Sequence, residues 1–288
     1  MFQLAVLALA ALGAHARTTS HYSGHAAANC TRASLKEATD RYVATQSTGQ
    51  INYLKAVSDL DRISYLENFN GTNIKTGVLS QALKIDHARS IYDTVTCASY
   101  TELIITDPKH PYVIGTQIHF TGPNITKIES VVTDADDWLF SAKHTLHYAL
   151  PENWETIPVE KRDSRATIQA AADAYLDLFN NKSVVVPWGY PCARLEGGLY
   201  TAKGLANDSC AVGVPSGVPL TRRRYVIDES IGTVDVLLAF GNTNNGLPDS
   251  HEFRVEGGKL RYVHTITACA SPNCGMKVPA ELSIDPGF

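Results

Sequence analysis

The sequence predicts an α+β protein made of two tandem copies of one structural plan. The chain repeats itself without gaps, because residues 115–132 (GTQIHFTGPNITKIESVV) align with residues 250–267 (SHEFRVEGGKLRYVHTIT) at an offset of 135 positions (250 − 115). A helical apolar pattern precedes each copy. Strand-like segments then follow one another and outnumber the helices, which is typical of an antiparallel sheet.

Residues 1–16 are predicted to be a signal peptide. Leu4 to Leu12 is an apolar run of suitable length, and Ala14-His15-Ala16 is a small-x-small cleavage site, although no Lys or Arg precedes the run. The run is too short to span a bilayer, and no later stretch is long enough. We therefore expect a secreted, soluble protein that begins near Arg17 and has no membrane partner.

Cysteines and glycosylation sequons agree with export. Six cysteines fit three disulfides, and sequence proximity favours one of the fifteen arrangements: Cys192–Cys210, Cys269–Cys274 and Cys30–Cys97. No C-x-x-C motif is present, which disfavours a zinc ribbon or a thioredoxin motif. Sequons for N-glycosylation occur at Asn29, Asn70, Asn124, Asn181 and Asn207.

The composition limits the function classes. Of 288 residues, 44% are hydrophobic, which is enough for a real core. The formal net charge is −4 and no basic stripe is present, so nucleic acid is not an expected partner. The chain has no G-x-S-x-G, Rossmann or Walker motif, which disfavours hydride and phosphoryl transfer.

The first copy is predicted to occupy residues 27–133. Leu35, Ala38 and Tyr42 keep helical spacing, so this helix has one apolar face that would cover a sheet. Strands follow, and the last two form a long hairpin. Its turn, Gly122-Pro123, is predicted to be exposed because a sequon lies beside it.

The second copy is predicted to occupy residues 164–275. Its helix repeats the apolar face of the first, with Ile168 and Tyr175 at helical spacing. Residues 134–163 form a linker rich in aromatic side chains, which are expected to pack because their exposure would be unfavourable. Residues 276–288 form a short tail.

Two stretches carry a family resemblance: residues 188–198 (WGYPCARLEGG) and 248–269 (PDSHEFRVEGGKLRYVHTITAC). A helix across a curved sheet that ends in Gly-Lys-hydrophobic-x-Tyr-x-His resembles the nuclear transport factor 2-like fold in its SnoaL-like form. The stretches are similar to a fungal secreted family of unnamed function, and the resemblance spans most of the chain after residue 16. It implies two cone-shaped curved antiparallel sheets, each covered by helices and each with a pocket.

The same resemblance sets the range of expected functions. The wider superfamily includes dehydratases, ketosteroid-type isomerases, polyketide cyclases and non-catalytic binding domains. The related fungal proteins are implied to include cyclases and hetero-Diels-Alderases. Superfamily membership alone does not choose among these activities.

The hairpin at 250–267 holds the main candidates for chemistry. A two-residue turn at Gly257-Gly258 would place His251 opposite His264 and Phe253 opposite Tyr262, all on one apolar side of the sheet. We therefore predict that both imidazoles face one cavity of the second domain.

Three interpretations of this histidine pair stay open: buried groups that hydrogen-bond their neighbours, a general acid/base pair, or metal ligands. The first copy has Thr116 and Glu129 at the matching positions, so any chemistry is expected in the second copy. His144-x-x-His147 has no adjacent acidic third ligand. We predict no metal and no cofactor.

The stretch WGYPCARLEGG supplies further candidates, because the resemblance places it at the mouth of the cone. Arg194 could bind a carboxylate, an enolate or a tropolone-like oxygen, or it could form only a local ion pair with Glu196. Asp228 either orients a histidine or is structural, since Asp93 repeats it in the first copy. The predicted catalytic residues are His264, His251, Arg194 and Tyr190, and the predicted substrate-binding residues are Trp188, Phe253, Tyr262, Glu196 and Tyr175.

These observations predict a cofactor-free enzyme of fungal secondary metabolism. Its substrate would be a small, apolar polyketide-type or terpenoid-type molecule that undergoes dehydration, isomerisation or cyclisation, in one form a hetero-Diels-Alder cycloaddition through a quinone methide. The competing class is a non-catalytic secreted binding protein or effector. The two copies are also compatible with face-to-face packing as an internal pseudo-dimer, and the chain with a homodimer.

Overall fold

The computed structural model describes residues 30–241 and 245–277. The predicted signal peptide, Asn29 and residues 278–288 of the predicted tail lie outside the described residues. No helix in the described part of the chain is long and apolar enough to cross a membrane.

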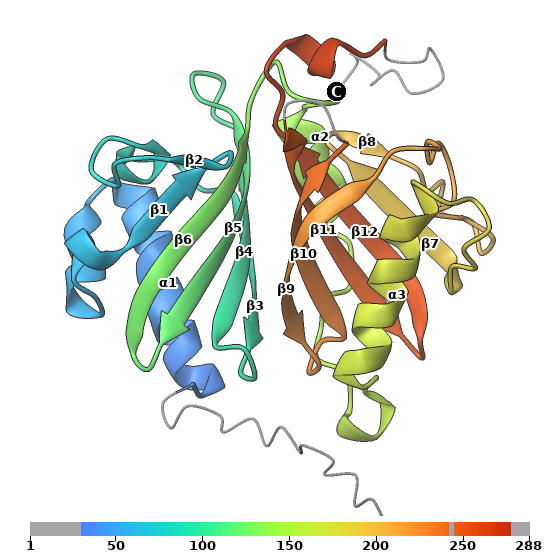
Figure 1. Ribbon diagram of the computed structural model, residues 1–288, viewed down its shortest axis with the longest axis horizontal. Helices are drawn as coiled ribbons and strands as arrows, with labels where there is room; N and C mark the ends of the chain where they lie inside the picture. The colour runs from blue at the N-terminus through green and yellow to red at the C-terminus, as the bar shows by residue number, and fades with distance from the viewer. Residues whose placement is uncertain (1–29, 242–244, 278–288) are drawn as a thin grey trace, which may run out of the picture.

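Two six-stranded sheets follow one another along the chain (Figure 1). The first has the order β2-β1-β6-β5-β4-β3 and the second β8-β7-β12-β11-β10-β9, so the second repeats the first strand by strand. The first contains β1 (Ser64–Glu67), β2 (Asn70–Gly71), β3 (His87–Asp93), β4 (Ala98–Ile105), β5 (Tyr112–Thr121) and β6 (Asn124–Thr133). The second contains β7 (Trp188–Glu196), β8 (Leu199–Tyr200), β9 (Leu220–Asp228), β10 (Thr233–Phe240), β11 (Leu247–Glu256) and β12 (Lys259–Thr267). The predicted α+β class and tandem arrangement are confirmed.

The sheets are mixed, which corrects the prediction of antiparallel sheets. β1 runs parallel to β6, and β7 runs parallel to β12, whereas the other neighbouring strands are antiparallel. A tight turn forces antiparallel pairing only on strands that are consecutive in the sequence. The first strand of each copy instead pairs with the last long strand of that copy, so no hairpin sets its direction.

One long helix lies on each sheet, on the side away from the other sheet (Figure 1). α1 (Arg32–Thr48) begins at a capping box in which Thr31 and Ser34 bond each other's backbone, and it ends at Gly49 in the left-handed conformation. α3 (Arg165–Leu178) begins at the cap Ser164. The apolar faces predicted for both helices are buried in the two cores.

The linker between the copies is packed, as predicted. It contains α2 (Ala142–Ala149), and Leu139 and Ile157 are buried. Short 3₁₀ turns complete the described part of the chain: η1 (Ile51–Ala56), η2 (Leu60–Arg62), η3 (Val78–Ser80), η4 (Val159–Lys161) and η6 (Pro272–Gly275).

The three predicted disulfides are confirmed. Cys30 bonds Cys97, Cys192 bonds Cys210 and Cys269 bonds Cys274. The first ties α1 to the first sheet, and the third closes a short loop after β12. Three disulfides are compatible with an oxidising compartment.

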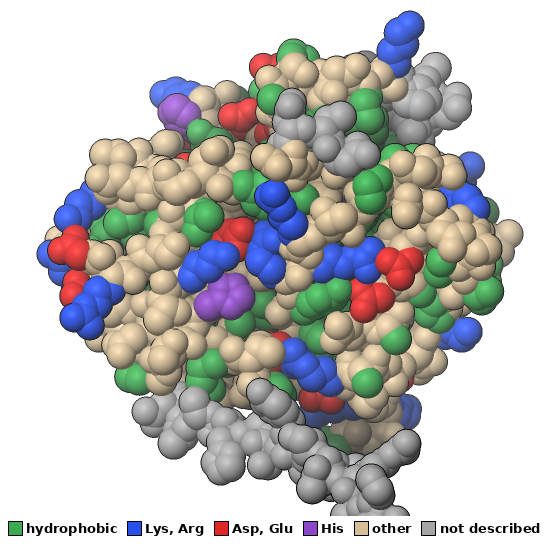
Figure 2. Space-filling view, in the orientation of Figure 1, with side chains coloured by type: hydrophobic (Ala, Val, Ile, Leu, Met, Phe, Trp, Pro, Cys, Tyr) green, Lys and Arg blue, Asp and Glu red, His purple; other side chains and the backbone are tan. Residues whose placement is uncertain are grey.

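The two sheets pack against each other, so the chain adopts the internal pseudo-dimer that the sequence had left as one option (Figure 1). Apolar side chains fill part of this junction, including Ile104 and Val113 from the first sheet and Leu237 and Ile266 from the second. Lys, Arg and acidic side chains gather across the middle of the face drawn in Figure 2.

Two reciprocal ion pairs join the halves. Arg32 of α1 reaches Asp228 of β9 (2.7 Å), and Arg165 of α3 reaches Asp93 of β3 (2.6 Å). Each aspartate also accepts a backbone N–H of the other half, from Tyr92 and Ile227 respectively. The duplicated aspartates are therefore structural, and neither orients a histidine.

The hairpin of β11 and β12 corrects the predicted histidine pair. The turn lies at Gly257-Gly258 as predicted, but a β-bulge follows it, so that Val255 pairs with Leu260 while Arg254 pairs with Tyr262. Arg261 is the extra residue. Beyond the bulge His251 pairs with Thr265, not with His264.

The bulge therefore puts the two histidines on opposite faces of the sheet, because side chains alternate along a strand. His251 faces α3, whereas His264 faces the first sheet, so the prediction of one shared cavity is wrong. Tyr262 likewise faces away from Phe253. The bulge keeps Leu260 and Val263 in the same core, and the first copy has its bulge at the matching place, beyond His119.

Candidate functional site

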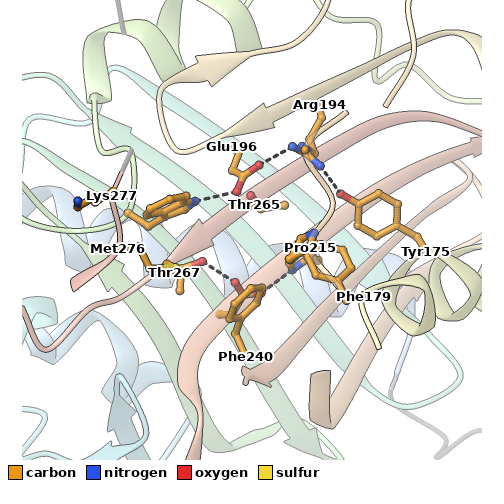
Figure 3. A pocket seen from close by; sticks show the side chains of 14 residues that line it. Tyr175, Phe179, Arg194, Glu196, Pro215, Phe240, Thr265, Thr267, Met276 and Lys277 are labelled. Atoms are coloured by element: carbon orange, nitrogen blue, oxygen red, sulfur yellow. Dashed lines mark hydrogen bonds and ion pairs between the residues drawn. The ribbon is translucent and has the colours of Figure 1, made fainter. Parts of the chain in front are cut away.

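A cavity of about 220 Å³ lies inside the second half, between the sheet and α3. Its lining comes from the linker, α3, strands β7, β10, β11 and β12, the loop before β9 and the segment after the last disulfide. The lining residues are Trp138, Tyr175, Phe179, Arg194, Glu196, Gly213, Pro215, Phe240, Asp249, His251, Thr265, Thr267, Met276 and Lys277 (Figure 3).

One wall of the cavity carries a hydrogen-bonded chain that ends at an imidazole. Thr267 Oγ1 donates to Asp249 Oδ2 (2.6 Å), and Asp249 Oδ1 bonds His251 Nδ1. Both His251 and Asp249 are buried. A carboxylate can only accept a hydrogen bond, so the neutral imidazole carries its proton on Nδ1. Nε2 then keeps the lone pair that a general base needs.

A second chain ends at a phenol. Trp138 Nε1 donates to Glu196 Oε1 (2.7 Å), Glu196 Oε2 pairs with the Arg194 guanidinium (2.8 Å), and Arg194 donates to Tyr175 Oη (3.2 Å) (Figure 3). Tyr175 Oη accepts this bond, so its own proton is available to a ligand.

Burial sets the protonation states of this second chain. It raises the pKa of the Tyr175 phenol, so that the hydroxyl stays protonated near neutral pH. Burial opposes the charge of Arg194, but Tyr175 and Glu196 outweigh it and the guanidinium pKa is raised. Arg194 Nε is buried without a partner among the described residues. Arg194 and Tyr175 both line the cavity, so the chain places a guanidinium and a hydroxyl in its wall.

The base and the phenol are neighbours. The ring centroids of His251 and Tyr175 are 5.9 Å apart. Phe253 packs behind both rings, with centroid distances of 5.9 Å and 5.2 Å, and Trp188 packs edge-on against Tyr175. Phe253 and Trp188 thus support the wall without lining the cavity.

The structure brings four of the nine predicted site residues together at the cavity: His251, Arg194, Glu196 and Tyr175. The local Arg194–Glu196 ion pair is present, and that Arg194 also binds a ligand oxygen stays a prediction. Three predicted residues lie elsewhere, and the first of them, His264, faces the first sheet. Tyr190 is 59% exposed on the outside of β7, and Tyr262 packs against Trp154 of the linker.

Sequence reasoning missed Asp249, Thr267 and Trp138. Asp249 stands two residues before His251 in a strand, so alternation alone places both on one face. That signal was available. Thr267 and Trp138 have no local signal, because each depends on a partner in another element: Thr267 bonds Asp249 of β11, and Trp138 bonds Glu196 of β7.

His264 belongs to a buried charge cluster between the sheets. Its Nδ1 bonds Glu102 (2.9 Å) and its Nε2 bonds Glu152 (2.6 Å). Arg89 donates to Glu102 and Glu252 (2.8 Å each) and lies over the Trp154 ring, which also contacts His264. His264, Glu102 and Glu252 are buried and every charged member is paired, so the cluster joins the halves.

Neighbouring charges govern the protonation of this cluster. Burial disfavours the charged imidazole, but Glu152 and Glu102 outweigh it and raise the pKa of His264 to about 10. Burial, Glu102 and Glu152 raise the pKa of Glu252 against the effect of Arg89. The pKa of Glu102 falls instead, because His264 and Arg89 outweigh its burial.

The same cluster contains a possible metal-binding group. One ligand atom each of Glu102, Glu252 and His264 lies within 4.8 Å of the others. Arg89 already donates to both carboxylates, so these ligands surround a guanidinium. We assign no metal to this group.

The first half differs from the second at the positions that correspond to the cavity wall. The offset of 135 positions aligns His251 with Thr116, Asp249 with Ile114 and Thr267 with Val132, so apolar residues replace two of the three polar ones. Thr116 bonds Tyr42 Oη (2.7 Å), and Tyr42 repeats Tyr175.

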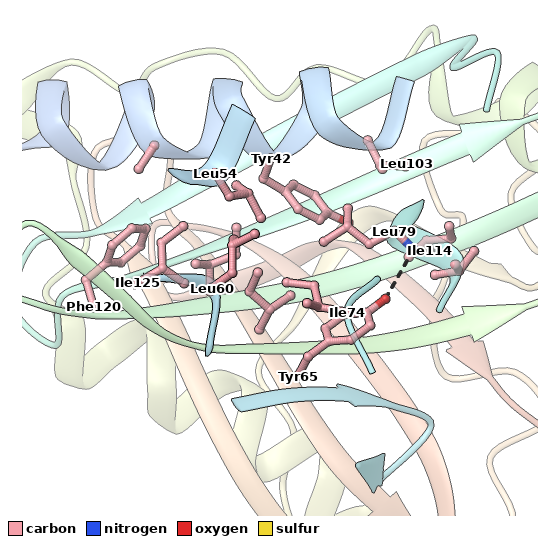
Figure 4. Close-up of a cluster of buried hydrophobic side chains, with 14 of the residues drawn as sticks. Tyr42, Leu54, Leu60, Tyr65, Ile74, Leu79, Leu103, Ile114, Phe120 and Ile125 are labelled. Carbon is pink, nitrogen blue, oxygen red and sulfur yellow. Dashed lines mark hydrogen bonds between the residues drawn. The ribbon is translucent and has the colours of Figure 1, made fainter. Parts of the chain in front are cut away.

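A short segment plugs this part of the first half. Strand register aligns Tyr65 and Glu67 with Arg194 and Glu196. The backbone of η3 bonds both side chains, since Leu79 N donates to Tyr65 Oη (3.3 Å) and Val78 N donates to Glu67. Leu79 is buried beside Tyr65 (Figure 4). What remains at this place is an open depression of about 390 Å³ that Glu67, Val78 and Val132 line, and Tyr42 and Thr116 do not line it.

The comparison with known families points to the same half. Residues 161–267 match a family described as "Domain of unknown function (DUF8021)". The DUF8021 match covers α3 and every strand of the second sheet, and therefore both hydrogen-bonded chains except Trp138. No curated protein matches the chain.

Proposed function

We propose that the second half is a cofactor-free acid/base enzyme that acts on a small, largely apolar molecule with a carbonyl or enol oxygen. The observation that carries this proposal is the pairing of an oriented base, His251, with a protonated phenol, Tyr175, on the wall of one cavity. Such a pair can remove a proton from carbon and stabilise the oxygen that gains charge.

Dehydration of a β-hydroxyketone illustrates the chemistry. His251 Nε2 takes the proton α to the carbonyl, and the C–H electrons form an enolate whose oxygen accepts a hydrogen bond from Tyr175. The enolate then expels the β-hydroxyl, which leaves as water with the proton returned by the imidazolium. Asp249 stabilises the transient charge on His251. Without the expulsion step, the same groups catalyse isomerisation.

The size of the cavity favours a reaction of one small molecule. Its volume, about 220 Å³, is below the range of about 300–1,000 Å³ typical of sites for drug-sized ligands. A cycloaddition that holds two partners together fits this volume poorly. Dehydration or isomerisation is therefore preferred over the hetero-Diels-Alder reaction.

The proposal also includes a SnoaL-like cone fold for each half and secretion of the protein. Each sheet with its helix would be a cone of the SnoaL-like type, which is supported by a long helix lying across each six-stranded sheet. Three disulfides support a secreted protein. Nothing in this assignment needs a cofactor.

A model substrate tests the proposal. Loss of water from 3-hydroxy-1-tetralone yields 1-naphthol after tautomerisation, and the fluorescence of the product reports the rate. We expect the full chain to accelerate the reaction over buffer and His251→Asn to lower kcat at least about 100-fold. His110→Asn, at an exposed turn, is the matched control and should leave the rate unchanged.

Equal rates for the wild-type protein and His251→Asn would contradict an acid/base role. Quenching of tryptophan fluorescence by 1-tetralone, which lacks the leaving group, measures binding separately because Trp138 lines the cavity. Binding without turnover would assign the cavity to the competing class, a secreted binding protein.

A further inference from the structure

A second depression, of about 740 Å³, lies on the other side of strand β7. Successive residues of a strand point to opposite faces, so Arg194 lines the cavity while Ala193 lines this outer groove. The groove is lined by Asn153, Tyr190, Pro191, Ala193, Tyr200, Ala202, Gly204, Leu205, Ala206, Asp208, Glu256, Arg261 and Tyr262. It therefore shares no residue with the proposed active site.

The groove combines exposed rings with planar polar groups. Tyr190 is 59% exposed and Leu205 is 54% exposed, and both line this groove. Arg261 donates to the carbonyl of Tyr190 (2.8 Å) and keeps further N–H donors. Tyrosine faces pack against the C–H faces of a pyranose, and guanidinium, carboxylate and amide groups bond its hydroxyls. The chemistry of this surface fits a saccharide.

A sequon, which is an attachment site for a saccharide, lies at the edge of the groove. Asn207 is exposed and stands between two lining residues, Ala206 and Asp208. It begins the sequon Asn-Asp-Ser. Asp208 fixes the loop, because its carboxylate accepts the backbone N–H groups of Lys203 and Leu205 (2.8 Å each).

We propose that an N-linked glycan on Asn207 folds back into this groove and covers Tyr190 and Leu205. The attachment transfers an oligosaccharide from a lipid pyrophosphate. Asn207 Nδ2 forms a C–N bond to the anomeric carbon of N-acetylglucosamine, the C–O bond to the pyrophosphate breaks, and the amide loses one proton. The proposal rests on export of the chain and not on the acid/base function.

Chemical reactivity of Tyr190 tests the docking. The full chain and Asn207→Gln are secreted from a eukaryotic host, and glycopeptide mass spectrometry measures occupancy at Asn207. Tetranitromethane then nitrates exposed tyrosines. We expect Tyr190 to react several-fold faster in Asn207→Gln, while Tyr53, 42% exposed in the other half, reacts equally in both proteins.

Asn124→Gln is the matched control, because Asn124 begins an exposed sequon at the β5–β6 turn of the first sheet. It should leave the nitration rate of Tyr190 unchanged. If Asn207→Gln is not secreted, trimming the wild-type glycan to one N-acetylglucosamine provides the same comparison.

Thermal unfolding supplies a second readout. Loss of the docked glycan is expected to lower Tm by about 2–4 °C, and Tyr190→Ala should lower Tm less in the Asn207→Gln background than in the glycosylated protein. An unoccupied Asn207, equal Tyr190 reactivity, or additive Tm changes would each overturn the proposal. Protection of Tyr190 that survives Asn207→Gln and grows with protein concentration would assign the groove to a second copy of the chain.

Discussion

At the scale of single residues, the second half differs from the first by polar groups buried where apolar ones would suffice. Asp249 and Thr267 stand where the first half has Ile114 and Val132. Buried polar groups reduce stability unless they are paired, and these two are paired with each other and with His251. A network of this kind is expected at a site of chemistry.

The duplication supplies a matched pair of variants. Tyr175→Phe removes the phenol that would donate to the substrate oxygen, so kcat for 3-hydroxy-1-tetralone should fall about 100-fold. Tyr42→Phe removes the equivalent buried hydroxyl of the first half, which bonds Thr116 of its own sheet and lies outside the proposed site. Its kcat should equal that of the wild-type protein. A similar loss in both variants would indicate a general structural effect.

At the scale of elements, the β-bulge decides which side chains meet. Without it, Val263 would leave the core and His264 would enter the cavity beside His251. The sequence does contain a signal for the bulge. The core residues Leu260 and Val263 are three positions apart, and Ile125 and Ile128 repeat this spacing. Regular alternation would have given a spacing of two.

The segment η3 is the second element that distinguishes the halves, because it fills space in the first half. A substitution at Leu79 tests this role. Leu79 is 1% exposed in the core of the first half, so Leu79→Ala should lower the free energy of unfolding by about 2–5 kcal/mol. Leu150→Ala, at a residue that is 59% exposed, should change it by less than about 0.5 kcal/mol. Urea denaturation measures both. A loss below about 1 kcal/mol for Leu79→Ala would show that η3 does not fill the space.

At the scale of the whole molecule, the two halves depend on each other. The reciprocal ion pairs and the His264 cluster bury charged groups that have partners in the opposite half. Breaking a buried pair leaves an unpaired charge, which is strongly unfavourable. We therefore expect the halves to fold as one unit.

Asp93 measures the coupling between the halves. Asp93→Asn weakens the bonds to Arg165 and to the backbone of Ile227, and it should lower the free energy of unfolding by about 1–3 kcal/mol. Asp40→Asn disrupts only an exposed pair with Lys36 and should cost about 0–0.5 kcal/mol. Urea denaturation that finds the two variants equally stable would contradict a structural role for Asp93.

The His264 cluster predicts how stability depends on pH. The folded-state pKa of His264, about 10, exceeds its ordinary value of 6.5, so the folded state holds an extra proton between these values. This stabilisation is complete below pH 6.5 and is lost as the pH rises towards 10, with a slope of at most about 1.4 kcal/mol per pH unit. The raised pKa of Glu252 acts in the same direction above pH 4.5.

Denaturation at pH 6, 8 and 9.5 checks this dependence. Stability should fall across the series, and His264→Gln should flatten the fall. His110→Gln, at the exposed turn, should keep the wild-type slope. A slope that His264→Gln leaves unchanged would assign the pH dependence to other groups.

Local sequence patterns were enough to predict the duplication, the two long helices, the hairpin turn and the three disulfides. Each depends on residues close in sequence or on the comparison of one copy with the other. The same reasoning found Tyr175, Arg194, Glu196 and His251 as individual candidates. It failed for the pairing of His251 with His264, because a one-residue shift of register moves every later side chain to the other face.

The amino-acid pattern alone settles the class of fold and its repetition, since helical and strand periodicities are local properties of the chain. The three-dimensional arrangement settles which histidine meets the cavity and which joins the halves. That choice depends on a bulge and on partners such as Glu102, 162 positions from His264 in the chain. Burial and charge pairing at such distances are decided only when the two sheets meet.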